Sequence, residues 1–68
     1  MLKCRVKWWD DAKGFGFLID SDGRDVFVHY SNIQMPGRRS LLEGQMVEYD
    51  AAMGPKGLHA TTVVPPGF

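Results

Sequence analysis

Aromatic rings recur at every second position in two short segments of the sequence, residues 14–18 and 26–30. The alternating rings are Phe15 and Phe17 in the first segment, and Phe27 and His29 in the second. Flat rings can stack on nucleobases, because every base has a π-face, and each stack contributes about 1–3 kcal/mol with little dependence on base sequence. The chemistry that this spacing favours is therefore noncovalent stacking.

Both segments have the composition of β-strands, in which successive side chains point to opposite faces of a sheet. Val26 and Val28 should then face one side and Phe27 and His29 the other, and Leu18 is expected to join the valines in the core. Outward rings are costly in water unless something covers them. We therefore expect the rings to form a contiguous binding patch.

Glycine and proline interrupt the chain at short intervals, so no stretch is typical of a long helix. We predict five strands, at residues 3–10, 14–20, 25–30, 45–53 and 58–64. Asp22-Gly23 predicts a hairpin between the second and third strands, because glycine supplies the positive φ of a tight turn. Ser31 is expected to cap one short helical turn.

So small a sheet leaves exposed edges unless it closes on itself. The predicted fold is therefore all-β, a five-stranded antiparallel Greek-key barrel. The length of 68 residues allows one domain, which we place at residues 1–64 with a C-terminal tail at residues 65–68. A monomer is expected.

Charge and cysteine content exclude several classes of protein. Eight basic and eight acidic side chains give a net charge of zero, so long-range attraction cannot be the main force that binds a polyanion. Cys4 is the only cysteine, which excludes an internal disulfide and a cysteine-paired zinc site. No apolar run is long enough to cross a membrane and no signal peptide is recognised, so a cytoplasmic protein is expected.

Catalysis finds little support in the residue pattern. The aspartates cluster near predicted turns, where aspartate is common, without a histidine or second group that would make a hydrolase or metal centre. We predict no enzyme activity, no metal and no cofactor. His59 is interpreted as an ordinary surface or core residue, and Cys4 as an inert small side chain.

Basic residues are expected at the rim of the aromatic patch, where they would meet phosphates: Lys7, Lys13, Arg38, Arg39 and Lys56. Trp8, Trp9 and Tyr30 could extend the patch, although Trp8 shares the parity of Val6 and could lie partly in the core. Gly14 and Gly16 carry no side chain that would obstruct a base. With three or four cations at phosphates, the predicted slope of log affinity against log salt is roughly −2 to −3.

Lys13-Gly14-Phe15-Gly16-Phe17 and Val26-Phe27-Val28-His29-Tyr30 together resemble the two ribonucleoprotein motifs of the bacterial cold-shock protein family. The similarity covers nearly the whole chain. It implies an oligonucleotide/oligosaccharide-binding (OB) barrel that binds single-stranded RNA and DNA, melts weak RNA secondary structure, and acts as an RNA chaperone or antiterminator. The family's contact residues map onto Lys7, Trp8, Lys13, Phe15, Phe17, Phe27, His29 and Tyr30.

The chain departs from the family pattern at several positions. Arg38 stands in the long loop where the family usually has an aromatic residue, although a guanidinium can still stack on a base or hold a phosphate. Asp10 stands where the family usually has asparagine, and a carboxylate lacks the amide's donor and repels phosphate. Leu58 and Thr62 replace the usual proline and asparagine.

Two alternatives explain the outward rings differently. A strand-exchanged dimer could cover the patch with a second chain. A small-barrel adaptor could use the same rings to bind proline-rich peptides, but that hypothesis does not explain the two ribonucleoprotein-like motifs. Binding to oligo-dT rather than to a proline-rich peptide would distinguish the leading hypothesis from the adaptor.

Overall fold

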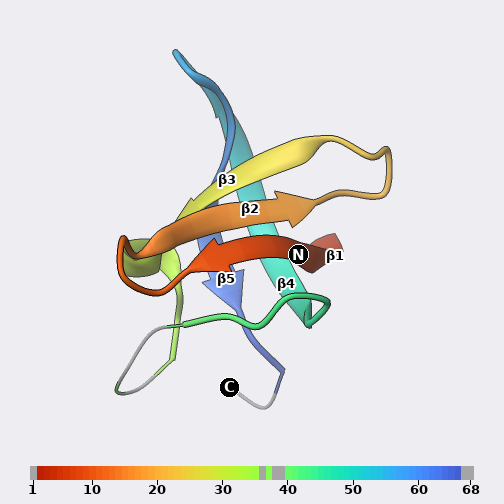
Figure 1. The fold of residues 1–68 in the computed structure, drawn as a ribbon. Helices are drawn as coiled ribbons and strands as arrows, with labels where there is room; N and C mark the ends of the chain where they lie inside the picture. The colour runs from red at the N-terminus through yellow and green to blue at the C-terminus, as the bar shows by residue number, and fades with distance from the viewer. Residues whose placement is uncertain (1, 36, 38–39, 67–68) are drawn as a thin grey trace.

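The structure, a computed structural model, is a closed barrel of five β-strands (Figure 1). It describes residues 2–35, 37 and 40–66. The elements are β1 (Leu2–Asp10), β2 (Phe15–Ile19), β3 (Asp25–His29), a 3₁₀ turn η1 (Tyr30–Asn32), β4 (Met46–Gly54) and β5 (Gly57–Val64). All five predicted strands are present, with ends within one residue of the prediction, and the all-β barrel is confirmed.

The strands follow the order β1-β2-β3-β5-β4 around the barrel, and β4 pairs back to β1. Four of the neighbouring pairs are antiparallel, whereas β3 and β5 run parallel, with Phe27 opposite His59. The antiparallel expectation is corrected at this pair. An odd number of strands cannot close into a ring through antiparallel pairs alone, so one parallel pair is a geometric necessity.

The core lies inside the barrel and is built from inward-facing aliphatic side chains. Leu18, Val26 and Val28 have no exposed surface, as their alternation with the aromatic residues predicts. Each fully buried side chain of this size contributes about 1.5–3 kcal/mol to folding. The other buried members are Cys4, Val6, Ile33, Leu41, Val47, Tyr49, Ala60 and Val63.

The turn between β2 and β3 is held by Asp20. Its Oδ1 accepts hydrogen bonds from the backbone amides of Asp22 and Arg24, at 2.9 and 2.8 Å, and its Oδ2 accepts one from Nε of Arg24. These bonds, chiefly the one from the Arg24 amide, lower the pKa of the Asp20 carboxyl. Gly23 has a φ of 81°, so the predicted Asp22-Gly23 turn is confirmed.

The short helical turn after β3 is present, but a different residue caps it. The turn begins at Tyr30, and the Nδ1 atom of His29 accepts a hydrogen bond from the Ser31 amide at 3.3 Å. Ser31 therefore lies within the turn, and its predicted capping role belongs to His29. The imidazole is thereby tied to the end of β3.

At the C-terminal end of the chain, Pro65 is fully buried and Pro66 is exposed. The predicted tail residues Gly67 and Phe68 lie outside the described residues. Within the described part of the chain, no helix has the length and apolar character needed to cross a membrane.

Candidate nucleic-acid interface

Four aromatic rings contact one another on the outer side of β1, β2 and β3, which lie side by side in Figure 1. Trp8 lies 5.6 Å from Phe15 and 6.3 Å from Phe17, measured between ring centroids. Phe27 lies 5.7 Å from Phe15 and 5.8 Å from Phe17. We call this set, together with His29, the aromatic face.

The aromatic face keeps part of its surface open to solvent. Trp8 is 39% exposed and Phe27 37% exposed, while Phe15, Phe17 and His29 are half-buried. Edge-to-face and tilted contacts between the rings are favourable in themselves and hold them in place. The rings are therefore positioned before any ligand arrives.

A β-bulge places Trp8 on this face. The β1–β2 register pairs Val6 with Leu18 but Trp8 with Phe17, so Lys7 is an extra residue in β1. Val6 is accordingly buried while Trp8 points outward. Strict alternation would have turned both residues the same way, and the bulge removes that reason for placing Trp8 partly in the core.

Trp9, the neighbouring tryptophan, takes the opposite orientation. It is half-buried and packs against the core cluster, and its indole Nε1 donates a hydrogen bond to Asp11 Oδ1 at 2.9 Å. It makes no ring contact with the aromatic face among the described residues. Trp9 is thus a packing residue rather than an extension of the patch.

Gly14 and Gly16 make room for the protein's own groups rather than for a ligand. Gly14 has a φ of 73°, and a Cβ there would lie 2.8 Å from the ring of Tyr30. A Cβ on the buried Gly16 would collide with the backbone oxygen of Trp8 and lie 2.8 Å from the Trp9 ring. The prediction that these glycines leave space for a base is corrected accordingly.

His29 and Tyr30 form a second ring pair at the end of β3. Their centroids are 4.5 Å apart, and Tyr30 is 47% exposed. The Nδ1 atom of His29 lies 2.9 Å from Ser31 Oγ, which fixes the orientation of the imidazole. His29 is also the strand partner of Phe15, so the pair adjoins the aromatic face.

The predicted basic residues have different surroundings. Lys7 Nζ forms an ion pair with Asp25, at 3.0 Å from Oδ1, and both side chains are about half exposed. Lys13 and Lys56 are exposed and have no acidic partner within the described residues. Arg38 and Arg39, which were predicted at the rim, lie outside the described residues.

Asp10 has a structural role that explains its position. Its Oδ1 accepts hydrogen bonds from the backbone amides of Ala12 and Lys13, each at 3.0 Å, and so closes the turn between β1 and β2. An asparagine oxygen could accept the same bonds. The carboxylate therefore organises the turn that presents the Lys13 side chain.

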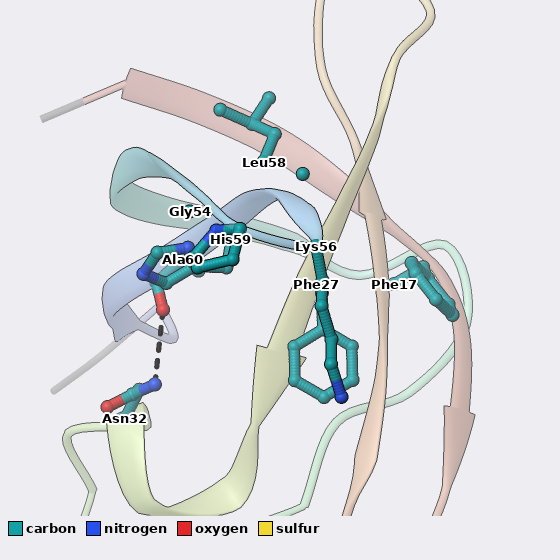
Figure 2. Close-up of a pocket in the computed structure, with 10 residues that line it drawn as sticks. Phe17, Phe27, Asn32, Gly54, Lys56, Leu58, His59 and Ala60 are labelled. Carbon is teal, nitrogen blue, oxygen red and sulfur yellow. Dashed lines mark hydrogen bonds between the residues drawn. The ribbon is translucent and has the colours of Figure 1, made fainter.

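A groove of about 600 Å³ continues from Phe17 and Phe27 toward the β4–β5 hairpin. Figure 2 shows the two phenylalanine rings on one side of the groove and His59 and Asn32 on the other. Its remaining lining residues are Gly54, Pro55, Lys56, Gly57, Leu58 and Ala60. Sequence reasoning missed His59, because only the parallel β3–β5 pairing places it beside Phe27.

A closed five-stranded barrel with aromatic rings over β2 and β3 defines the OB class, whose members bind oligonucleotides or oligosaccharides on that face. The family model described as the 'Cold-shock' DNA-binding domain matches residues 2–66. The chain belongs to the cold-shock domain family. As a member of this family it is a nucleic-acid-binding protein and not an enzyme.

Similar curated proteins come from several bacteria. The cold shock-like protein CspD of Escherichia coli (strain K12) is 53% identical over 66 residues, covering 96% of this chain and 89% of the relative. Cold shock-like protein CspC of Bacillus cereus is 55% identical over 63 residues, covering 93% and 97%. Cold shock-like protein CspA of Stigmatella aurantiaca (strain DW4/3-1) is 58% identical over 59 residues, covering 85% and 87%.

Proposed function

We propose that this protein binds single-stranded RNA and DNA by stacking unpaired bases on the aromatic face, and that it acts as an RNA chaperone or antiterminator. The observation that carries the proposal is the set of four outward rings in mutual contact on a protein of zero net charge. Stacking supplies affinity that does not depend on a large positive charge or on a particular base sequence.

The proposed contacts include two kinds of side chain. Trp8, Phe15, Phe17, Phe27, His29 and Tyr30 stack on bases, and Lys7, Lys13 and Lys56 meet phosphates at the edges. Arg38 remains a prediction from the sequence. Since the face takes only unpaired bases, binding favours the open form of an RNA hairpin by mass action and needs no nucleotide hydrolysis.

Phe27→Ala tests the stacking proposal directly. Phe27 contacts both Phe15 and Phe17, so its removal takes one ring away and loosens two others. We expect the Kd for oligo-dT to rise about 5- to 150-fold, the equivalent of losing one stack of about 1–3 kcal/mol. Quenching of tryptophan fluorescence measures the Kd, because Trp8 is part of the face.

Met46→Ala is the matched control. Met46 is 39% exposed, close to the 37% of Phe27, but it lies on β4 in a separate depression that shares no lining residue with the groove. It should bind oligo-dT as the wild type does. Full affinity in Phe27→Ala would contradict the stacking proposal, and binding of a proline-rich peptide without binding of oligo-dT would favour the adaptor alternative.

The chaperone step needs its own assay. A short RNA hairpin labelled with a fluorophore and quencher should open in the presence of the wild-type protein without ATP, and less readily with Phe27→Ala. Size-exclusion chromatography with and without oligonucleotide tests the expected monomer against the strand-exchanged dimer. Tight binding of oligo-dT without hairpin opening would contradict the chaperone role and leave the binding role intact.

A further inference from the structure

His59 occupies a position that the proposed stacking contacts leave unused. It lies in β5 as the strand partner of Phe27, is half-buried, and lines the groove that continues from the aromatic face (Figure 2). Among the described residues its imidazole has no hydrogen-bond partner. A strand leaving the aromatic face through this groove would pass beside it.

The elements around His59 bring one charged group to the groove. In β4, Ala52 is the strand partner of His59, and a Cβ added at Gly54 would lie 3.0 Å from the imidazole. From η1, Asn32 donates a hydrogen bond to the Ala60 carbonyl at 3.1 Å, and β3 contributes Phe27. The turn after β4 contributes Lys56, and no carboxylate lines the groove within the described residues.

We propose that His59 takes up a proton when a phosphate-bearing single strand enters this groove, so that nucleic-acid binding strengthens as the pH falls. The inference rests on the proposed function and adds a regulatory property to the same site. Imidazole side chains change charge between about pH 5 and 8. Lys56 lines the same groove as a second cation, and a phosphate bound beside the imidazole would favour its charged form.

The sign of the effect follows from reciprocity. If bound phosphate favours the protonated imidazole, the protonated imidazole must favour bound phosphate by the same factor. Stabilisation of the charged form equivalent to half to one pH unit corresponds to about 3- to 10-fold tighter binding. Aspartate and glutamate side chains are ionised throughout the range from about pH 5.5 to 8.5, so they add little to the change.

The test compares the affinity for oligo-dT at about pH 5.5 and about pH 8.5, at constant ionic strength, in the wild type and in His59→Gln. Thymine does not titrate in this range, so the ligand is constant. For each protein, the affinity at the lower pH is divided by the affinity at the higher pH. This ratio should be about 3- to 10-fold larger in the wild type than in His59→Gln. The comparison between variants matters because His29 also carries an imidazole.

Lys56→Gln is the matched control in the same groove. Lysine stays charged throughout this range, so the variant should bind more weakly at both pH values and keep the wild-type pH ratio. A His59→Gln variant with the wild-type ratio would overturn the inference while leaving the proposed function intact. Absence of oligo-dT binding at every pH would instead contradict the proposed function itself.

Calorimetry provides a second measurement. Titration of the wild type and of His59→Gln with oligo-dT near pH 6.5, in two buffers with different ionisation enthalpies, reports the number of protons that each protein takes up on binding. Proton uptake by the wild type that is lost in His59→Gln supports the inference, and equal uptake by the two proteins, or no uptake by the wild type, overturns it. Circular dichroism of each variant at both pH values confirms that the proteins compared are folded.

Discussion

At the scale of single residues, the ion pair between Lys7 and Asp25 sets how much positive charge the aromatic face can offer. Lys7 is the bulge residue of β1 and its ammonium group lies 3.0 Å from the Asp25 carboxylate. An exposed pair of this kind contributes at most about 1 kcal/mol to stability. Its larger effect is to place a carboxylate where a phosphate would otherwise meet the lysine.

Asp25→Asn should therefore change the salt dependence of binding. Freed of its partner, Lys7 can neutralise a phosphate more completely than it does beside Asp25, and the slope of log affinity against log salt should become steeper by up to about 0.7. Affinity for oligo-dT at low salt should rise. Fluorescence titrations at several salt concentrations measure both quantities.

Asp22→Asn is the control for this prediction. Asp22 lies in the turn after β2 and pairs with Arg24 at 3.4 Å, so the substitution removes a carboxylate of the same kind without releasing Lys7. Its slope should stay close to that of the wild type. If Asp25→Asn weakened binding without changing the slope, Asp25 would have to contact the nucleic acid itself.

Individual residues also show what the sequence could reveal about the site. Phe15, Phe17 and Phe27 were predictable because β2 and β3 alternate regularly and a short turn joins them. Trp8 was ambiguous because a bulge has no signature that distinguishes it from regular alternation. The position of His59 beside Phe27 could not be predicted, because the two residues are 32 positions apart in the chain and meet only through the parallel β3–β5 pairing.

At the scale of elements, the pairing of β1 with β2 determines whether the aromatic face is assembled. Gly16 lies opposite Trp9 next to the bulge, where the two backbones approach closely. The strands themselves could be predicted from composition and from glycine and proline positions. Their closure could be predicted only in outline: the odd number of strands requires a parallel pair, but no local pattern shows that β3 and β5 form it.

Gly16→Ala should destabilise the β1–β2 pair and with it the protein. The added methyl group would collide with the Trp8 backbone oxygen, which a side-chain rotation cannot relieve. Overpacking of this kind costs about 1–3 kcal/mol and occasionally more. Urea unfolding followed by circular dichroism measures the loss.

Gly23→Asn is the companion variant for Gly16→Ala. Gly23 has a φ of 81° and open space around its Cβ position, and asparagine is among the residues that tolerate this conformation. Its cost should be below about 1 kcal/mol. Equal stabilities of the two variants would show that β1 can shift away from β2 without loss.

At the scale of the whole molecule, Cys4 reports on opening of the barrel. It is 5% exposed, and burial raises the pKa of its thiol to about 11. The thiolate is the reactive form, so in the folded protein near pH 8 the thiol should react far more slowly than glutathione. Added urea should accelerate labelling in step with the loss of the circular dichroism signal.

Labelling of Cys4 at the rate of glutathione without urea would contradict this expectation and indicate local fraying of β1. The labelling rate can be assigned to Cys4, because it is the only cysteine in the chain. Since the raised pKa keeps the thiol protonated up to well above pH 8, a change of pH between 6 and 8 should leave the labelling rate of the folded protein low throughout.

The parallel seam between β3 and β5 has a consequence for the loaded protein. Its strand register consists of the pair Phe27 and His59, and both residues line the groove together with Phe17 and Lys56. A nucleic acid bound in the groove would contact both β3 and β5, whose register has a single residue pair. At a nucleic-acid concentration of about 100 times the Kd, binding would raise the free energy of unfolding by about 2.7 kcal/mol. Bound RNA would thus stabilise the folded barrel reversibly.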